Sequence, residues 1–81
     1  MTIDVHFYSI SRDIAGQPAR QIAVPEGSTL ADALDVLFRE VPALADIRGA
    51  CLYAVGTSYA TMKRALAAGE VISIIPPMQG G

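Results

Sequence analysis

The sequence predicts an α+β fold, a mixed sheet covered by one main helix, from three observations. Residues 3–7 alternate apolar and polar side chains, which is typical of a strand with one face in a core. Residues 30–41 carry apolar side chains at the i, i+3, i+4, i+7 spacing of a helical stripe. Residues 71–75 are apolar at nearly every position, as in a central strand covered on both faces. A chain of 81 residues has room for one domain with one core.

The first strand is expected over residues 2–10, with one apolar face toward the core. Residues 11–18 are rich in turn-forming side chains and are predicted to form a loop. Residues 19–24 form a second short strand, which the turn at residues 25–27 closes.

The helix has clear start and stop signals. Ser28 or Thr29 can accept the first unpaired backbone N–H groups, and Asp32 stands favourably in the first turn. Pro42 ends the helix because proline has no backbone N–H and clashes with the preceding turn.

The second half of the chain is less periodic. Residues 43–49 are predicted to form a connector with at most one helical turn, and residues 50–55 a buried strand. After a turn, residues 59–62 are a candidate short edge strand. Residues 65–70 are an irregular stretch with a turn at Gly69.

This element order defines a β-grasp, or ubiquitin-like, roll. Two hairpin strands, a helix that crosses one sheet face and a last strand beside the first are expected over residues 1–75, followed by an extended tail over residues 76–81. One helix covers only one face of the sheet. The other face must therefore be polar or bind a partner.

Composition narrows the classes of function. Of the residues, 52% are hydrophobic and 17% charged, which favours a hydrophobic partner surface. The basic residues are scattered and the net charge is −2, so no nucleic-acid site is expected. No apolar stretch is long enough for a membrane span, and no export signal is expected from the first residues. A lone cysteine, Cys51, rules out an internal disulfide or a cysteine cluster for a metal, and fits a cytoplasmic protein.

The tail has a composition suited to insertion. Its prolines favour extension, and six residues would project the terminal carboxylate roughly 20 Å beyond the last strand. Its glycines remove side chains from the final stretch, so that the end can enter a narrow channel. The predicted insertion segment is Pro76, Pro77, Met78, Gln79 and Gly80, with the reacting carboxylate on Gly81.

The ending VISIIPPMQGG is similar to the strand-Pro-Pro-x-x-Gly-Gly ending of the small subunits of molybdopterin synthase, which are ubiquitin-like sulfur carriers. The turn from Ser11 to Gly16 and the helix start from Thr29 also resemble that family, and so does the length. The chain departs from the family pattern at Gly56 and Gly69, which concern loop contacts and not the terminus.

The resemblance implies a carrier cycle. An ATP-using adenylating enzyme would activate the Gly81 carboxylate, and sulfur would then convert it into a thiocarboxylate. The tail would donate this sulfur to the cyclic pyranopterin precursor in the large subunit of the synthase, within a heterotetramer. The chain itself would bind no cofactor and no metal, and it would be non-catalytic alone because the acid–base groups belong to the partner.

Two other hypotheses remain open. A sulfur carrier for another product, such as thiamin, or a ubiquitin-like protein modifier would use the same activated end with a different acceptor. Alternatively, the chain is a β-grasp interaction module whose terminal glycines have no chemical role.

The resemblance also implies an apolar docking face beside the tail. We expect Ile75 and Met78 to contribute to it, and Phe7 is a further candidate although its default place is the core. Arg12 and Lys63 are candidate contacts at the rim.

Other polar residues favour ordinary structural roles. His6 is the only histidine and is expected at a surface or an interface. Cys51, in an apolar strand, is expected to be an inert thiol. Asp32 and Asp35 are predicted to lie on the solvated face of the helix.

Overall fold

A computed structural model describes residues 1–77 of the chain. The elements in chain order are β1 (Thr2–Phe7), α1 (Ile10–Ala15), β2 (Ala19–Ala23), α2 (Leu30–Glu40), the 3₁₀ helix η1 (Pro42–Ala50), β3 (Leu52–Val55), β4 (Ser58–Tyr59) and β5 (Val71–Ile75).

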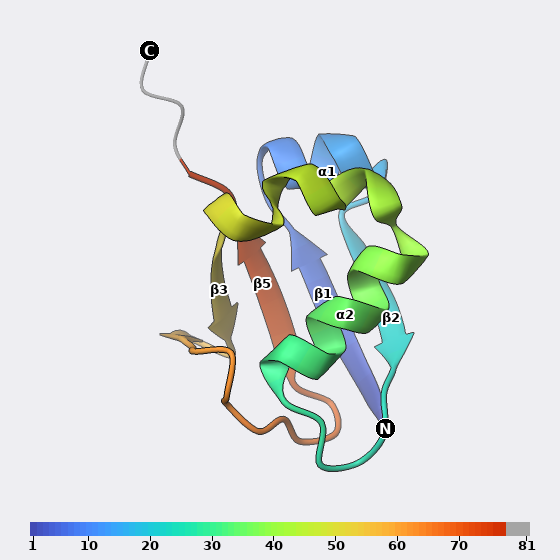
Figure 1. Cartoon of the computed structure of the whole chain (residues 1–81), viewed down its shortest axis with the longest axis vertical. Coiled ribbons are helices and arrows are strands. Elements are labelled where there is room, and N and C mark those ends of the chain that lie inside the picture. Colours follow the sequence, from blue (N-terminus) through green and yellow to red (C-terminus); the bar gives the residue numbers. More distant parts are fainter. Residues whose placement is uncertain (78–81) are drawn as a thin grey trace.

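The strands form one five-stranded mixed sheet in the order β2-β1-β5-β3-β4. β1 and β5 are parallel, and the other neighbours are antiparallel. α2 and η1 lie across the same face of this sheet, and β1 and β5 end at the same edge (Figure 1). The predicted hairpin, the crossing helix and the pairing of the last strand with the first are confirmed, so the chain has the β-grasp topology.

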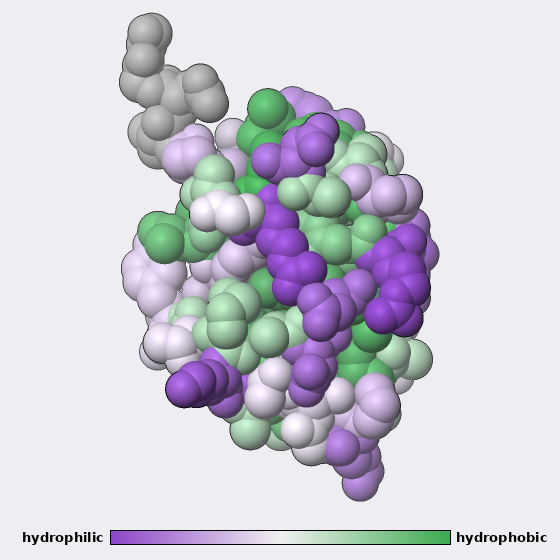
Figure 2. All heavy atoms as spheres, in the orientation of Figure 1, coloured by the Kyte–Doolittle hydropathy of each residue, from purple (hydrophilic) through white to green (hydrophobic). Residues whose placement is uncertain are grey.

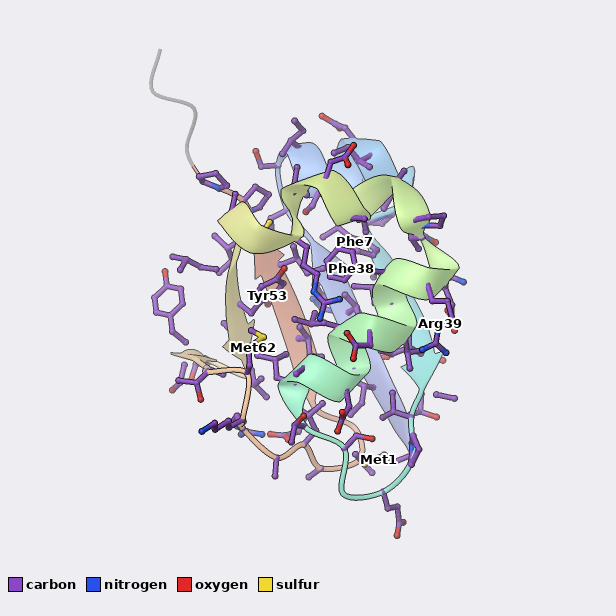
Figure 3. The ribbon with its side chains drawn as sticks, in the orientation of Figure 1. Met1, Phe7, Phe38, Arg39, Tyr53 and Met62 are labelled. Carbon is purple, nitrogen blue, oxygen red and sulfur yellow. The ribbon has the colours of Figure 1, made fainter. Side chains whose placement is uncertain are left out.

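The core fills the layer between the sheet and the helices. Phe7 of β1 and Phe38 of α2 both belong to it (Figure 3). Its largest fully buried apolar side chains are Ile3, Leu30, Leu34, Leu37, Leu44, Ile72, Ile74 and Val5. Burial of a leucine or isoleucine side chain contributes about 1.5–3 kcal/mol, so this single layer stabilises the fold.

α2 begins with a capping box. The Asp32 amide donates to the Thr29 hydroxyl oxygen over 3.3 Å, and the Thr29 amide donates to the Asp32 carboxylate over 2.9 Å. Two N–H groups that lack helical partners are thereby bound. The helix ends at Glu40, and Pro42 opens η1 at a position where its missing N–H is not needed. The predicted bounds of this helix are confirmed.

The segment after β1 differs from the sequence prediction. β1 ends at Phe7, and Ile10–Ala15 is a short helix where a loop was expected. Gly16 ends the helix in the left-handed region, at φ 72°, and its amide donates to the Arg12 carbonyl over 2.9 Å. Local backbone hydrogen bonds hold this helix together, and it has no apolar stripe. A prediction from apolar periodicity therefore does not detect it.

Three further predictions need correction. The connector is a nine-residue 3₁₀ helix, η1, and the short edge strand β4 has only two residues. β5 is not covered on both faces: its side chains alternate between buried and half-buried, because α2 and η1 lie on one face only. Only every second side chain of β5 faces the core, so its apolar run is longer than burial on one face requires.

The loop between β4 and β5 accepts hydrogen bonds from the first backbone amides of α2. The Leu30 amide donates to the Arg64 carbonyl over 2.9 Å, and the Ala31 amide donates to the Met62 carbonyl over 3.0 Å. The Arg64 guanidinium binds both carboxylate oxygens of Glu70 at 2.6 and 2.8 Å. This ion pair therefore braces the loop whose carbonyls bind the first amides of the helix.

The Arg64–Glu70 ion pair should make the free energy of unfolding depend on pH in the acidic range. The hydrogen bond from Arg64 and, next, the one from the Ala67 amide lower the pKa of Glu70. A carboxyl whose pKa is lower in the folded state stabilises the fold above about pH 5 and loses this contribution as the pH falls. The urea midpoint of the wild type should therefore fall more between pH 7 and pH 3 than that of Glu70→Gln. Equal falls in the two proteins would contradict this prediction.

Candidate functional site

The sheet face opposite α2 is not covered by any described element. The register of the strands places on it Asp4 and His6 of β1, Val71, Ser73 and Ile75 of β5, and Leu52 and Ala54 of β3. Toward the end of β5 this face is apolar, whereas Asp4 and His6 make it more polar beside the start and the middle of β5. The helix-covered face, in contrast, shows many hydrophilic side chains over α2 (Figure 2).

The apolar part of this face contains a shallow hollow of about 500 Å³. We call it the open-face hollow, and its lining is Tyr8, Ala54, Gly56, Thr57, Tyr59, Ser73 and Ile75. Ile75 is the last residue of β5, and the buried Pro76 and the exposed Pro77 follow it directly. The hollow therefore lies at the root of the C-terminal segment.

Three large exposed apolar side chains of the described residues lie in or beside the hollow. Among residues 1–77, the large apolar side chains that are exposed are Tyr8, Ile10, Leu52, Tyr59 and Met62. Tyr8 and Tyr59 line the hollow and are 49% and 71% exposed, and Leu52, at 59%, is paired with Ile75. Such a concentration of apolar surface on a small protein marks a site for a partner.

The sequence prediction found only part of this face. Ile75 lies on it as expected, but Tyr8, Leu52 and Tyr59 were not singled out. The period of two already placed Tyr8 opposite the core face, so that signal was available. Tyr59 could not be assigned, since its position depends on a two-residue strand.

The remaining predicted contacts lie apart. Phe7 is 2% exposed and packs in the core, its default place in the sequence analysis, whereas its neighbour Tyr8 lines the open-face hollow. Arg12 is exposed on α1 and lines a small hollow with Tyr8. Lys63 is exposed on the loop at the start of α2, at the opposite end of the sheet from Ile75.

The predicted tail residues divide at Pro77. Pro76 is buried against the domain and Pro77 is exposed. Met78, Gln79, Gly80 and Gly81 lie outside the described residues. The predictions for these four positions therefore stay predictions.

Cys51 lies in a second hollow of about 530 Å³, which Tyr53 and Met62 also line (Figure 3). Burial raises the pKa of the Cys51 thiol. Burial, together with the neighbouring Cys51, raises the pKa of Tyr53 to about 12, and the Tyr53 hydroxyl donates to the Arg48 carbonyl over 2.8 Å. A raised pKa leaves less of the thiol as the nucleophilic thiolate, so the surroundings of Cys51 do not favour a reactive cysteine.

Residues 1–77 contain no group of three or more His, Cys, Asp or Glu side chains arranged to hold a metal ion. No helix within the same residues is long and apolar enough to cross a membrane.

The chain is 31% identical over 83 residues to a molybdopterin synthase sulfur carrier subunit of Chlamydomonas reinhardtii, with all of both chains covered. It is 30% identical to the subunit of the same name from Arabidopsis thaliana, over 98% of this chain and 82% of that one.

Solved structures share the fold. The crystal structure of SAMP1 from Haloferax volcanii superposes with a TM-score of 0.92 at 24% identity, over all of both chains. A complex of subunits 1 and 2 of molybdopterin-converting factor from Helicobacter pylori contains a chain that matches with a TM-score of 0.73 at 24% identity, again over all of both chains. The model of the ThiS family matches residues 5–81. The chain belongs to the ThiS family.

Proposed function

We propose that the chain is the sulfur carrier subunit of a molybdopterin synthase, and that the carboxylate of Gly81 is the group that carries the sulfur. The observation that carries this proposal is the apolar hollow at the root of a segment that ends in Gly80 and Gly81. The relatives that share the whole length of the chain have the same named role.

The carboxylate must first be activated, because it is a poor acyl donor with a bad leaving group. In the proposed cycle an adenylating enzyme that uses ATP transfers AMP to the Gly81 carboxylate and releases pyrophosphate. A persulfide sulfur then displaces AMP, and a thiol reduces the S–S bond to leave a thiocarboxylate. ATP belongs to the activating enzyme in this cycle, and this chain holds no cofactor of its own.

The thiocarboxylate then acts in a second protein, the large subunit of the synthase, where it donates sulfur to the cyclic pyranopterin precursor. Four residues follow Pro77, and they reach about 14 Å when fully extended. The large subunit must therefore sit against the root of the tail, where Tyr8, Tyr59 and Ile75 offer it an apolar surface. Two copies of each subunit would form a heterotetramer.

In this scheme the contribution of the chain is positioning. It presents one reactive end within reach of a docking surface, about 14 Å at most from Pro77, which turns a bimolecular encounter into a directed one. Groups for acid–base chemistry are supplied by the large subunit. The chain is thus a substrate-like subunit of a sulfurtransferase and is not catalytic alone.

Intact mass spectrometry tests the proposal directly. Chain purified from cells that make the molybdenum cofactor should contain a fraction heavier by the replacement of one oxygen with sulfur, and fragmentation should place the change on Gly81. Deletion of the activating enzyme should abolish this fraction.

The alternatives predict different results. A protein modifier would give larger conjugates on a denaturing gel that depend on Gly81, with no gain of sulfur. A carrier for thiamin or another product would gain sulfur but would fail to support molybdopterin synthesis with the large subunit. An interaction module would show neither conjugates nor a gain of sulfur at Gly81. Each of these three results would contradict the proposal.

A further inference from the structure

One buried side chain holds the backbone of Tyr8. Ser11, in the first turn of α1, is fully buried, and its hydroxyl donates to the Tyr8 carbonyl over 2.6 Å. The same hydroxyl oxygen accepts from the Tyr8 amide over 3.0 Å. The Ser11 amide also donates to the Tyr8 carbonyl, over 3.1 Å. Both backbone polar groups of Tyr8 are therefore bound to Ser11.

Tyr8 lies just beyond the support of the sheet. The parallel pairing of β1 with β5 ends at Phe7 and Ile74, so Tyr8 and Ile75 are the next residues along these strands. Both side chains line the open-face hollow, and that of Tyr8 is half exposed. Since the β1–β5 pairing stops one residue short of Tyr8, the Ser11 hydroxyl supplies the backbone bonds that a longer strand would have made.

The residue between Tyr8 and α1 is strained. Ser9 has φ 55° and ψ −133°, and it is the only non-glycine residue with a positive φ among residues 1–77. Only glycine adopts this conformation easily. In any other residue it persists only where the surrounding contacts enforce it. The Ser11 hydroxyl binds the backbone of Tyr8, on the other side of Ser9, and so holds the strained residue in its conformation.

We propose that Ser11 is a positioning residue for docking: its hydroxyl fixes the backbone of Tyr8 and so keeps the Tyr8 ring in place at the rim of the open-face hollow. This inference rests on the proposed function, because it assumes that the large subunit binds this face. Ser11 itself is fully buried and does not touch the partner. It acts on affinity only through Tyr8.

The chain contains a matched control. Ser28 is 5% exposed, its hydroxyl donates to the Pro25 carbonyl over 2.6 Å, and its amide donates to the same carbonyl over 3.2 Å. The two bonds to the carbonyl match those of Ser11, but proline has no amide that could donate to the hydroxyl, and Ser28 lies before α2, at the end of the sheet away from Ile75. Ser28→Ala and Ser11→Ala each remove one buried hydroxyl, so both should lower thermal stability, and Ser11→Ala should lower it more because it also leaves the Tyr8 amide without its hydroxyl partner.

Affinity for the large subunit encoded in the same genome separates the two variants. Measured by calorimetry with full-length chains, Ser11→Ala should weaken binding about fivefold to tenfold, and Ser28→Ala less than about twofold. Ser11→Thr keeps the hydroxyl and should restore most of the affinity. In a Tyr8→Ala background, Ser11→Ala should change affinity less than about twofold, because its effect passes through Tyr8.

A second readout does not depend on the partner. Hydrogen exchange of the Tyr8 amide should accelerate in Ser11→Ala and remain slow in Ser28→Ala. If Ser11→Ala does not fold, Ser11→Cys replaces it with the same expectations, since a thiol is a weak donor. Equal affinities of the Ser11 and Ser28 variants, or an undiminished effect of Ser11→Ala in the Tyr8→Ala background, would overturn the inference alone. Failure of the wild type to bind the large subunit would overturn the proposed function and this role with it.

Discussion

Deletion of Gly81 should abolish sulfur transfer while the fold stays intact. The residue carries the carboxylate that is activated in the proposed cycle, and its loss leaves Gly80 one residue, about 3.5 Å, short of the reacting position. A displacement of this size is enough to prevent a reaction that depends on placing two atoms in contact. Molybdopterin synthesis, reconstituted with the large subunit and the activating enzyme, should fall to background.

Two controls make this result interpretable. The urea midpoint of the truncated chain should equal that of the wild type, because the core is formed by residues before Pro76. Binding to the large subunit should also persist in part, since the open-face hollow remains. Synthesis at the wild-type rate by the truncated chain would rule out Gly81 as the sulfur carrier.

Ile75→Lys should weaken binding to the large subunit by about 2 kcal/mol, or roughly thirtyfold. The side chain of Ile75 lines the open-face hollow at the root of the tail and is only half-buried in the chain alone. A partner that covers this position would bury an unpaired ammonium group, which is costly. The dissociation constant, measured by calorimetry, provides the test.

Val71→Lys is the matched control for this substitution. Val71 lies on the same face of the same strand, is also half-buried and stands at the opposite end of β5. Its cross-strand neighbour is Asp4, which can accept the new charge. This variant should bind within about twofold of the wild type, and equal losses in both variants would show that the partner does not dock at the end of β5.

Sequence periodicity predicted those parts of the fold that are built on a buried stripe. α2 was predicted because five of its side chains face the core at helical spacing and a capping box marks its start. The strands β1, β2 and β5 follow for the same reason. The helices α1 and η1 were missed or shortened, because each contributes only one buried residue, Ser11 and Leu44 respectively.

The sequence allowed a hypothesis for the chemistry of the candidate site but not for its surface. Gly80, Gly81 and the two prolines stand close together in the sequence, so a joint role could be proposed for them without a structure, and it stays a prediction. The open-face hollow joins Tyr8, Tyr59 and Ile75, which come from three separate segments, and only the strand register brings them together. The position of Lys63 relative to this hollow was hidden for the same reason, as the register places its loop at the other end of the sheet.

The central position of β5 has a mechanical consequence. In the proposed cycle, a partner that draws the tail into a channel would pull on the end of this strand. β1 flanks it in parallel on one side and β3 in antiparallel on the other. Tension along β5 therefore loads the hydrogen bonds of both ladders in shear, all at once, and does not peel them apart one by one. In the proposed cycle the load of each insertion would therefore be shared across the middle of the sheet.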